Sequence, residues 1–566
     1  MGARDLLKRS ARLRLLVRRL RAEAYAFPRW RPILDASRDV WETARAARRN
    51  GPPVLIATGV GGHPYAVILE SLLGVALTLR GADVRFLLCD SALPACELAE
   101  YTWFPDVGRF ARHGPQAGLC GVCFAPARTA LEPLGLPVHR YSDFLTAEDR
   151  GTIDRLAGDV ATSDIEGFKL DGLAVGEHAR AGALRFYARG DIADERHAEA
   201  VLRRYFRAAL ITTCALRRLL TSEAVRTAVF QHGIYVPQGL VGEVCRERGV
   251  RVVNWNVAYR RQRFIFSHGD TYHHTMMSEP VDLWDRLEVT PALNDDVMDY
   301  LESRRKGSRD WIWFHERPLE DIDAIAQELG VDFSRPWVGM LTNVFWDAQL
   351  HYHANAFPTM LDWVVDTIDY FVKRPELILI VRIHPAELRG TLPSRQPLLD
   401  EIRRRFPQLP ENIRLIPPES QISTYAAMSQ CNAVVIYGTK TGVELAARGI
   451  PVIVAGEAWI RGKGISLDAS TRADYFDLLD RLPLTATLDP ATVERARRYA
   501  YHFFFRRMIP VEAVTPRKGW LPYELGISSV EECLPGRSAG LDVICDGILN
   551  GTEFVYPEEQ KIGRPR

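Results

Sequence analysis

Short apolar runs alternate with amphipathic segments along most of the chain. In the first half, apolar runs start at Val54 (VLIAT) and Val84 (VRFLLC), and residues 65–80 between them have the spacing of a helix. The alternation resumes at residues 228–233 (AVFQHG) and 251–256 (RVVNWN). Apolar strands that alternate with helices predict βαβ units in a mostly parallel sheet.

The second half repeats this alternation. Strands are predicted at residues 337–341, 378–383, 413–416, 433–437 and 451–455, with helices between them. We therefore predict an α/β protein with two Rossmann-like, doubly wound domains. The expected divisions are a basic N-terminal segment 1–50, a first domain 51–330 with a helical insertion near 145–222, a second domain 331–490, and a crossover helix and tail at 491–566.

The chain is long enough for two domains and carries almost no net charge. Its 566 residues include 47% hydrophobic and 25% charged residues, which is typical of a globular protein. Lys and Arg number 72 against 71 Asp and Glu, so the charge balance of +1 gives no sign of a nucleic-acid partner. We also find no run of about 18 apolar residues, the length that a membrane span needs.

Residues 1–50 differ from the rest because they hold 14 Arg or Lys against five acidic residues. Leucines are interleaved with the basic residues, as in a helix that lies on an anionic membrane surface. A solvated helix packed on its own domain is the alternative. The segment lacks the apolar core of a signal peptide. We therefore expect a cytoplasmic protein, with peripheral contact at the inner face of the cell membrane left open.

Nine cysteines in a chain of this length are too few for a secreted disulfide scaffold, so reduced thiols are expected. Cys89, Cys96, Cys120 and Cys123 cluster in the sequence, and the last two form a C-x2-C. The four could chelate zinc, but C-x6-C is no standard spacing of zinc ligands. Buried thiols are the alternative that we favour.

A histidine marks one strand end of the second half. His384 and Pro385 directly follow the predicted strand 378–383. They therefore lie at its carboxyl end, where open α/β sheets bind their ligands. A histidine there can donate a hydrogen bond to a phosphate oxygen, while proline fixes the turn. A histidine that only caps the loop is the alternative.

A glycine-flanked loop follows the strand 433–437 and precedes a helix; it reads Gly438, Thr439, Lys440, Thr441 and Gly442. Backbone amides at a helix N-terminus favour an anion, and the lysine adds a positive charge. Glu444 is a candidate acceptor of hydrogen bonds from ribose hydroxyls, with a first-turn acid facing the helix dipole as the alternative. The spacing is that of neither a P-loop nor a dinucleotide fingerprint, so a plain tight turn also stays open.

Two more strand ends of the second half carry charge. Arg461 and Lys463 follow the strand 451–455 in a glycine-spaced loop. Two cations there suit a diphosphate or a carboxylate-bearing sugar, and a mobile solvated loop is the alternative. Asp347, in the loop after the strand 337–341, is a further acidic candidate for the catalytic set or a solvated loop acid.

Histidines also end strands of the first half. His63 follows a glycine loop, residues 59–62, whose glycines would let another molecule approach the backbone closely. It is a candidate general base towards an acceptor hydroxyl, with a structural role as the alternative. His232 likewise lies at the end of the strand that starts at residue 228. Ser267, His268 and Asp270 lie in a third predicted loop.

The strand-ending His384-Pro385 and the following segment 437–463 resemble the bacterial capsule polysaccharide biosynthesis proteins and related glycosyltransferases of the GT-B fold. In that group an HP motif and a later Ser/Thr motif occur in enzymes that use nucleotide-activated Kdo or sialic acid. The HP motif also occurs in glycerophosphotransferases that polymerise teichoic acids. The resemblance covers mainly residues 335–465.

The resemblance implies two domains that face each other across a cleft, with the donor nucleotide held mainly by the second and the acceptor by the first. His384 would contact the donor phosphate, and Thr439 and Thr441 stand where the Ser/Thr motif lies. It implies a nucleotide-sugar substrate and no cofactor or metal. GTKTG departs from the doubled serine of the group, and the GVGGH loop is similar to glycine loops of lipid-linked N-acetylglucosamine transferases. Both CMP-linked and UDP-linked donors therefore stay open.

The sequence thus predicts a glycosyltransferase that moves a sugar from a nucleotide donor to a surface polysaccharide or glycolipid. A CDP-glycerol or CDP-ribitol phosphotransferase and a nucleotide-sugar epimerase of the same architecture are the enzymatic alternatives. A non-catalytic subunit of capsule assembly is the third.

Overall fold

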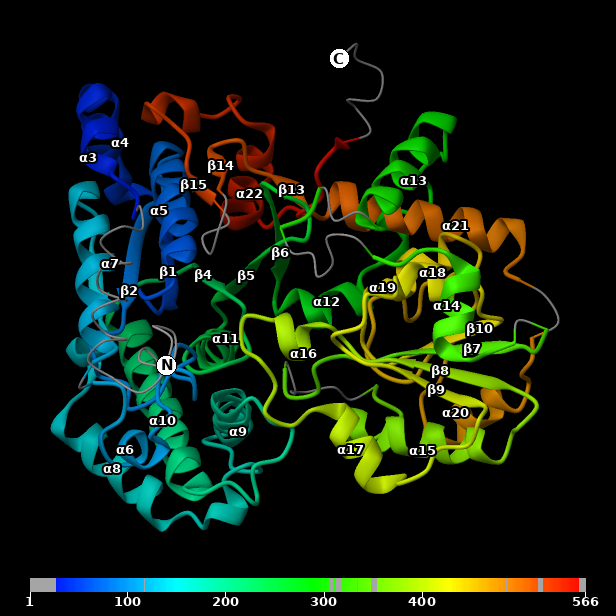
Figure 1. Ribbon diagram of the computed structural model, residues 1–566. Coiled ribbons are helices and arrows are strands. Elements are labelled where there is room, and N and C mark those ends of the chain that lie inside the picture. The colour runs from blue at the N-terminus through cyan, green and yellow to red at the C-terminus, as the bar shows by residue number, and fades with distance from the viewer. Residues whose placement is uncertain are drawn as a thin grey trace, which may run out of the picture. The chain divides into compact units, whose positions relative to one another are not determined.

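The computed structural model describes residues 27–116, 118–305, 309–311, 318–332, 334–347, 354–484, 487–517 and 523–558. The first 26 residues of the predicted basic segment lie outside this part; helices α3 (Trp30–Ala36) and α4 (Arg38–Ala47) form the remainder. The described chain divides into two compact units (Figure 1). Unit 1 combines the ranges up to Tyr187, Asp191–Tyr272 and Met508–Tyr556, and unit 2 combines Ala188–Gly190 with His273–Arg507.

Unit 1 is built on a seven-stranded sheet with the strand order β13-β6-β5-β4-β1-β2-β3. The five strands from β3 to β5 are parallel, and β6 and β13 add an antiparallel edge. The strands are β1 (Pro53–Gly59), β2 (Asp83–Leu88), β3 (Val138–Arg140), β4 (Thr227–Gln231), β5 (Arg251–Val257), β6 (Arg263–His268) and β13 (Ile509–Pro510); a separate hairpin pairs β14 (Val514–Pro516) with β15 (Tyr523–Leu525).

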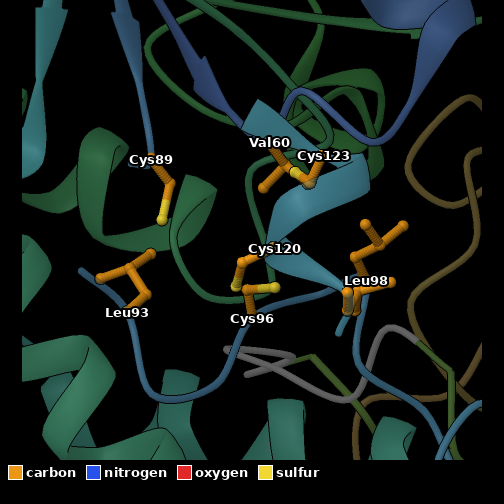
Figure 2. Close-up of a pocket in the computed structure, with 8 residues that line it drawn as sticks. Val60, Cys89, Leu93, Cys96, Leu98, Cys120 and Cys123 are labelled. Carbon is orange, nitrogen blue, oxygen red and sulfur yellow. The ribbon is translucent and has the colours of Figure 1, made fainter. Parts of the chain in front are cut away.

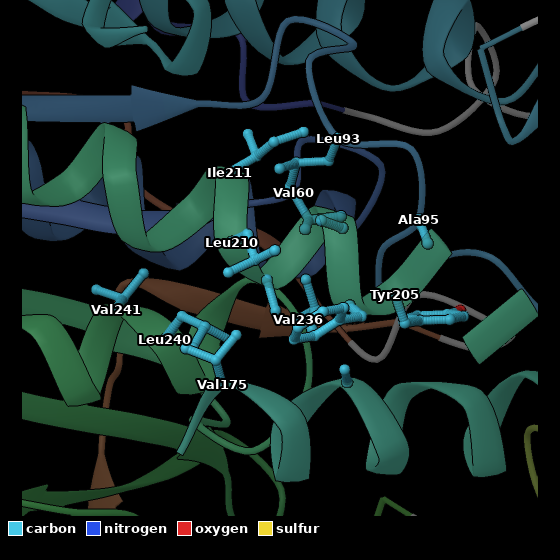
Figure 3. Packing of buried hydrophobic residues seen from close by; sticks show 14 of the residues in the cluster. Val60, Leu93, Ala95, Val175, Tyr205, Leu210, Ile211, Val236, Leu240 and Val241 are labelled. Carbon is cyan, nitrogen blue, oxygen red and sulfur yellow. The ribbon is translucent and has the colours of Figure 1, made fainter. Parts of the chain in front are cut away.

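Helices pack on both faces of this sheet, as a parallel sheet requires. Alternate positions of β1 point to opposite faces, so Leu55 and Ala57 join the core formed with α9, α10 and α11, whereas Thr58 points at α5. Figure 3 shows part of that core, in which Tyr205, Leu210 and Ile211 of α10 pack beside the strand-end loops. The helices are α5 (Pro64–Leu79), α6 (Val107–His113), α7 (Phe124–Leu131), α8 (Ala147–Asp159), α9 (Val175–Tyr187), α10 (Ala198–Ser222), α11 (Gln238–Glu247) and α22 (Ala539–Asn550).

Unit 2 contains a six-stranded, fully parallel sheet with the order β12-β11-β10-β7-β8-β9. Its strands are β7 (Trp337–Leu341), β8 (Ile378–Arg382), β9 (Ile413–Ile416), β10 (Ala433–Ile436), β11 (Val452–Val454) and β12 (Leu467–Asp468). Helices α15 (Met360–Val372), α17 (Leu398–Arg405) and α20 (Arg472–Leu479) cover one face, and α14 (Ile322–Leu329), α18 (Thr424–Ser429) and α19 (Thr441–Ala446) the other (Figure 1). The remaining helices are α12 (Tyr272–Ser278), α13 (Pro291–Arg305), α16 (Ala386–Arg389) and α21 (Pro490–Tyr501), which runs into a π-helical turn, His502–Arg506.

These strand orders confirm the predicted fold class, an α/β protein with two Rossmann-like, doubly wound sheets. Read outward from its centre, unit 2 has the Rossmann order, because the chain moves from β7 to β9 on one side and then from β10 to β12 on the other. Unit 1 reverses in the same way between β1 and β4. The crevice at such a reversal is where open α/β sheets bind ligands. The expectation that the two units face each other across a cleft stays a prediction.

Three details differ from the sequence-based expectations. The boundary lies between Tyr272 and His273 rather than near residue 330, because α13 packs on α21 within unit 2. Ser267 and His268 belong to the antiparallel strand β6, not to a loop, and the His268 ring stacks on Phe554 at 4.4 Å. The tail, for which the pattern gave no assignment, adds β13 and α22 to unit 1.

The buried carboxyl of Glu70 predicts how the stability of the protein depends on pH. Glu70 in α5 accepts hydrogen bonds from the Thr58 hydroxyl and, at 3.0 Å, from Trp255 Nε1. Burial raises the pKa of this carboxyl to about 7, so its contribution to stability is full below pH 4.5 and is lost as the pH rises towards 7. Glu70→Gln removes that loss. We expect thermal unfolding to show the variant gaining up to about 3 kcal/mol on wild type between pH 4.5 and 8.

The exposed Glu553→Gln is the control for this measurement. Its unfolding curve should follow that of wild type at every pH. A Glu70→Gln protein whose stability relative to wild type does not change with pH would show that the carboxyl is ionised throughout the range.

Candidate functional site

His384 lies at the carboxyl end of β8, beside the strand reversal of unit 2. Its backbone N–H donates to Thr342 Oγ1 at 3.2 Å, and its ring Nδ1 accepts from the backbone N–H of Ala386 at 3.0 Å. Burial first, and then the nearby cations Lys440 and Arg382, lower the pKa of His384 to about 4. The imidazole is therefore neutral at pH 7, and because Nδ1 accepts, the hydrogen is on Nε2. Such a ring presents a neutral N–H donor.

The GTKTG loop follows β10, so it ends a strand on the other side of the same reversal. Thr439 Oγ1 accepts from the backbone N–H of Thr441 at 3.3 Å, and its hydroxyl donates to Thr441 Oγ1 at 3.2 Å. The helix after the loop, α19, is only six residues long. The loop therefore precedes a helix as predicted, and the anion site at the N-terminus of this short helix stays a prediction. The positive charge of the loop comes from Lys440.

Glu444 does not face a ribose; it is buried under the loop. Its carboxylate is 1% exposed, and Oε1 lies 3.2 Å from Lys440 Nζ and 3.0 Å from Arg304 Nε. Burial alone would raise the pKa of this carboxyl, but the two cations outweigh burial and bring the pKa to about 2. The carboxylate thus fixes the Lys440 side chain. Glu444 is thus not in a position to bind a ribose of the donor nucleotide; it anchors the loop instead.

Arg304, on α13, completes this buried group and was missed by sequence reasoning. Its guanidinium contacts the Asp310 carboxylate as well as Glu444, and Nη1 donates to the Tyr300 hydroxyl at 3.1 Å. The Tyr300 hydroxyl in turn donates to Asp310 Oδ1 at 2.9 Å. Two buried cations therefore meet two buried carboxylates. The sequence signal was weak, because α13 lies in a charged, proline-punctuated segment that reads as a connection.

The other predicted residues of unit 2 are placed differently. Lys463 is 1% exposed and donates to the carbonyl oxygens of Met277 and Glu279, both at 3.0 Å. Arg461 donates to the carbonyls of Gly456 and Ala469 at 3.1 and 2.6 Å. Both cations thus hold backbone segments, which corrects their assignment to a diphosphate. Asp347 is exposed in the loop after β7 and stays a candidate.

In unit 1 the structure brings His63 and His232 together around a third residue, Glu97. His63 follows β1 and His232 follows β4, so both lie at the strand reversal of this sheet. Nε2 of His63 is 3.7 Å from Oε2 of Glu97. Burial would raise the pKa of the Glu97 carboxyl, but His63, His232 and Arg185 outweigh it and hold the pKa far below its ordinary value. His232 has a φ of 65°, a strained conformation of the kind found at functional sites.

The glycine loop before His63 is packed against the chain itself and not open to a ligand. A Cβ on Gly61 would lie 2.5 Å from Ala127 Cβ, and one on Gly62 would lie 2.2 Å from Leu98 Cδ2. The glycines are therefore needed because α7 and the loop after β2 approach so closely. This corrects the expectation that they admit another molecule. Their effect is to fix the position of His63.

The four clustered cysteines lie behind this loop. Cys89, Cys96, Cys120 and Cys123 line one small apolar pocket together with Val60, Leu93, Leu98 and Leu119 (Figure 2). Burial raises the pKa of the Cys89 thiol to about 12, so this thiol is protonated at neutral pH. No group of three or more His, Cys, Asp or Glu among the described residues is arranged to hold a metal ion. Cys123 is buried and the other three cysteines are half-buried.

None of the described helices combines the length and the apolar character needed to cross a bilayer. Contact of the basic N-terminal segment with a membrane surface stays a prediction.

Comparisons with known proteins find likeness in structure alone. No protein-family model matches the chain, and no curated protein matches it either. Thermosulfurimonas dismutans KpsC, a beta Kdo 2,4 transferase, is 14% identical with a TM-score of 0.33 over 49% of this chain and 80% of that chain. Methanocaldococcus jannaschii UDP-GlcNAc 2-epimerase, in complex with UDP-GlcNAc and UDP, is 11% identical with a TM-score of 0.26 over 79% and 98%.

A third similar structure is MnaA of S. aureus with UDP, at 9% identity and a TM-score of 0.27 over 85% of this chain and 94% of that chain. Identities and TM-scores this low do not establish a shared activity. The function proposed below therefore rests on the residues of this chain.

The buried charges around Glu444 give a second prediction. Arg304→Met removes the guanidinium that pairs with Asp310 and Glu444, and breaking a buried ion pair costs about 3–5 kcal/mol. We expect a loss of stability of that order, measured as a fall in the urea midpoint. Arg305→Met is the matched control. Arg305 is the next residue along α13, but its guanidinium is more exposed and pairs with Glu302 and Glu320 at the surface. It should change stability by less than about 1 kcal/mol. Equal effects of the two variants would contradict this interpretation.

Proposed function

We propose that the chain is a glycosyltransferase that moves a sugar from a CMP-linked or UDP-linked donor to a surface polysaccharide or glycolipid. The observation that carries the proposal is the pairing of a neutral His384 with Lys440 at the strand reversal of unit 2. His384 offers an N–H donor, and Lys440 offers the N–H donors of an ammonium group that Glu444 holds in place. A phosphate oxygen that becomes more negative as the sugar leaves is stabilised by such groups.

The loop is prepared for this charge before any ligand binds. Glu444, which is itself paired with Arg304, holds Lys440 in place, so its ammonium need not be ordered during the reaction. Thr439 and Thr441 are linked to each other, which fixes the turn beside it. Preorganised groups stabilise developing charge without a cost of reorganisation at the moment of reaction.

Unit 1 supplies the groups for proton transfer. His63 removes the proton from the acceptor hydroxyl as the oxygen of that hydroxyl attacks the anomeric carbon and the bond to the donor phosphate breaks. His232, at the end of the neighbouring strand β4, lies at the same edge of the sheet. Asp347 is the further acidic candidate of the catalytic set.

An epimerase is the second candidate function, and the acid–base cluster of unit 1 favours it. Two imidazoles and a carboxylate gather around one strand reversal, and epimerisation requires a proton to be removed and then returned. This reaction needs no acceptor. It would incorporate deuterium from heavy water into the sugar of the nucleotide sugar, whereas transfer would not.

The proposal is tested by incubating the full chain with CMP-, CDP-, UDP- and GDP-linked donors, with and without lipid-linked or polysaccharide acceptors. We expect acceptor-dependent release of the nucleotide from one donor class. Conversion of the sugar without acceptor and with deuterium uptake would instead identify the epimerase. Release of no nucleotide from any donor, and no conversion, would leave the non-catalytic assembly subunit as the alternative.

Variants of the donor loop sharpen this test. His384→Ala and Lys440→Met remove the N–H donor and the positive charge, and each should lower the rate of nucleotide release about 10- to 1,000-fold. Lys373→Met, an exposed lysine at the end of α15 in the same unit, is the control and should keep the wild-type rate. Wild-type rates in both loop variants would contradict a role of this loop in the chemistry.

A further inference from the structure

Glu97 is a buried carboxylate that the motifs did not single out, and its surroundings are those of a built site. It lies in the loop after β2, is 5% exposed, and faces His63, which is 7% exposed. Its position does not depend on His63. Oε2 accepts from Gln238 Nε2 at 2.7 Å, its backbone N–H donates to Val236 O at 2.8 Å, and its carbonyl accepts from Arg185 Nη1 at 2.7 Å.

The residues on either side of Glu97 hold it as firmly. Cys96 and Leu98 line the small apolar pocket behind the glycine loop (Figure 2), so the loop of Glu97 and the loop of His63 pack on each other. The groups that face the carboxylate are His63, His232 and Arg185, with the Tyr65 hydroxyl near it. The carboxylate therefore has its own anchors and is presented to the imidazole ready-formed.

We propose that Glu97 is a positioning residue that keeps the hydrogen of the His63 ring on Nε2, so that Nδ1 is the atom that accepts the proton. The role of the proton acceptor rests on the proposed function; the control of the tautomer does not. An Nε2–H directed at a carboxylate is stabilised, and the lone pair then lies on the opposite nitrogen. Among the described residues, Nδ1 of His63 makes no hydrogen bond that would occupy this lone pair.

In the transfer step, Nδ1 takes the proton of the acceptor hydroxyl while the oxygen forms the bond to the anomeric carbon. The electron pair of the broken sugar–phosphate bond stays on the phosphate. The imidazole then carries a positive charge, which Glu97 faces at the 3.7 Å contact. This contact is longer than a hydrogen bond. Catalytic hydrogen bonds are often long before the substrate binds and tighten when it does.

A second buried histidine–glutamate pair in unit 1 differs from His63 and Glu97 in what the Nδ1 atom of the histidine does. His178 and Glu243 approach to 3.9 Å through Nε2, so the type of contact is the same. Nδ1 of His178, however, lies 2.6 Å from the carbonyl oxygen of Ile234 and must donate to it. That ring cannot accept a proton at Nδ1. Glu243 is therefore the matched control for Glu97.

The first test reads the tautomer directly and needs no substrate. The full chain is labelled with ¹⁵N-histidine, and the ring signals of His63 are assigned by their loss in His63→Gln. At a pH where the ring is neutral, we expect the Nε2–H form in wild type. Glu97→Gln presents either an amide N–H or a carbonyl to the ring, so the hydrogen should shift at least partly to Nδ1. Glu243→Gln should leave the His63 signals unchanged. A wild-type ring with its hydrogen on Nδ1, or no change in Glu97→Gln, would overturn the proposal.

The second test uses the donor that the panel identifies. Glu97→Gln should lower kcat about 100-fold or more while KM for the donor stays within about 3-fold, because the wrong tautomer cannot accept the proton. Glu243→Gln should keep kcat within about 2-fold. A rise of KM with unchanged kcat would overturn the role in proton transfer. Absence of activity with every donor would refute the proposed function alone, since the tautomer experiment is independent of it.

Discussion

The ion pairs of the buried Glu444 carboxylate are the interaction on which the loop after β10 depends. Burial in an apolar interior opposes ionisation, yet two cations approach the same carboxylate oxygen and keep it charged. The Lys440 side chain is therefore held in one position and is not a mobile surface lysine. A carboxylate cannot be buried without such partners. Arg304 supplies one of them, and Asp310 in turn pairs with Arg304. Together they join α13 to the loop after β10.

The same constraint shapes unit 1. Glu97 is buried and ionised, and what surrounds it are two imidazoles, a guanidinium and an amide. In both units the buried carboxylate lies behind a strand reversal and faces a nitrogen-bearing side chain at its edge. Parallel sheets bring this about, since all their carboxyl ends open on one side and the loops there escape the demands of the core.

The pattern of apolar residues predicted most of the fold, because parallel strands buried on both faces read as continuous apolar runs. It placed β1, β2, β4, β5 and β7 to β11 and the helices of the insertion. It missed β6, whose histidine and serine read as a loop. It also missed β3, β12 and the strands of the tail, which are two or three residues long. His63, His232, His384 and Lys440 were found because each directly ends a strand. Glu97 and Arg304 were not, since Glu97 faces His63 and Arg304 pairs with Glu444, and both of these partners are far away in the sequence. Lys463 was misread because a cation that binds carbonyls looks the same in sequence as one that binds phosphate.

The most direct test of the central claim is titration calorimetry of the protein with UDP and CMP, compared with uridine and cytidine. If His384 and Lys440 bind the phosphate, one nucleotide should bind at least about 10-fold more tightly than its nucleoside, and this advantage should shrink in Lys440→Met and at high salt. Equal affinity for nucleotide and nucleoside, or an advantage that survives the loss of Lys440, would contradict a phosphate site at this loop.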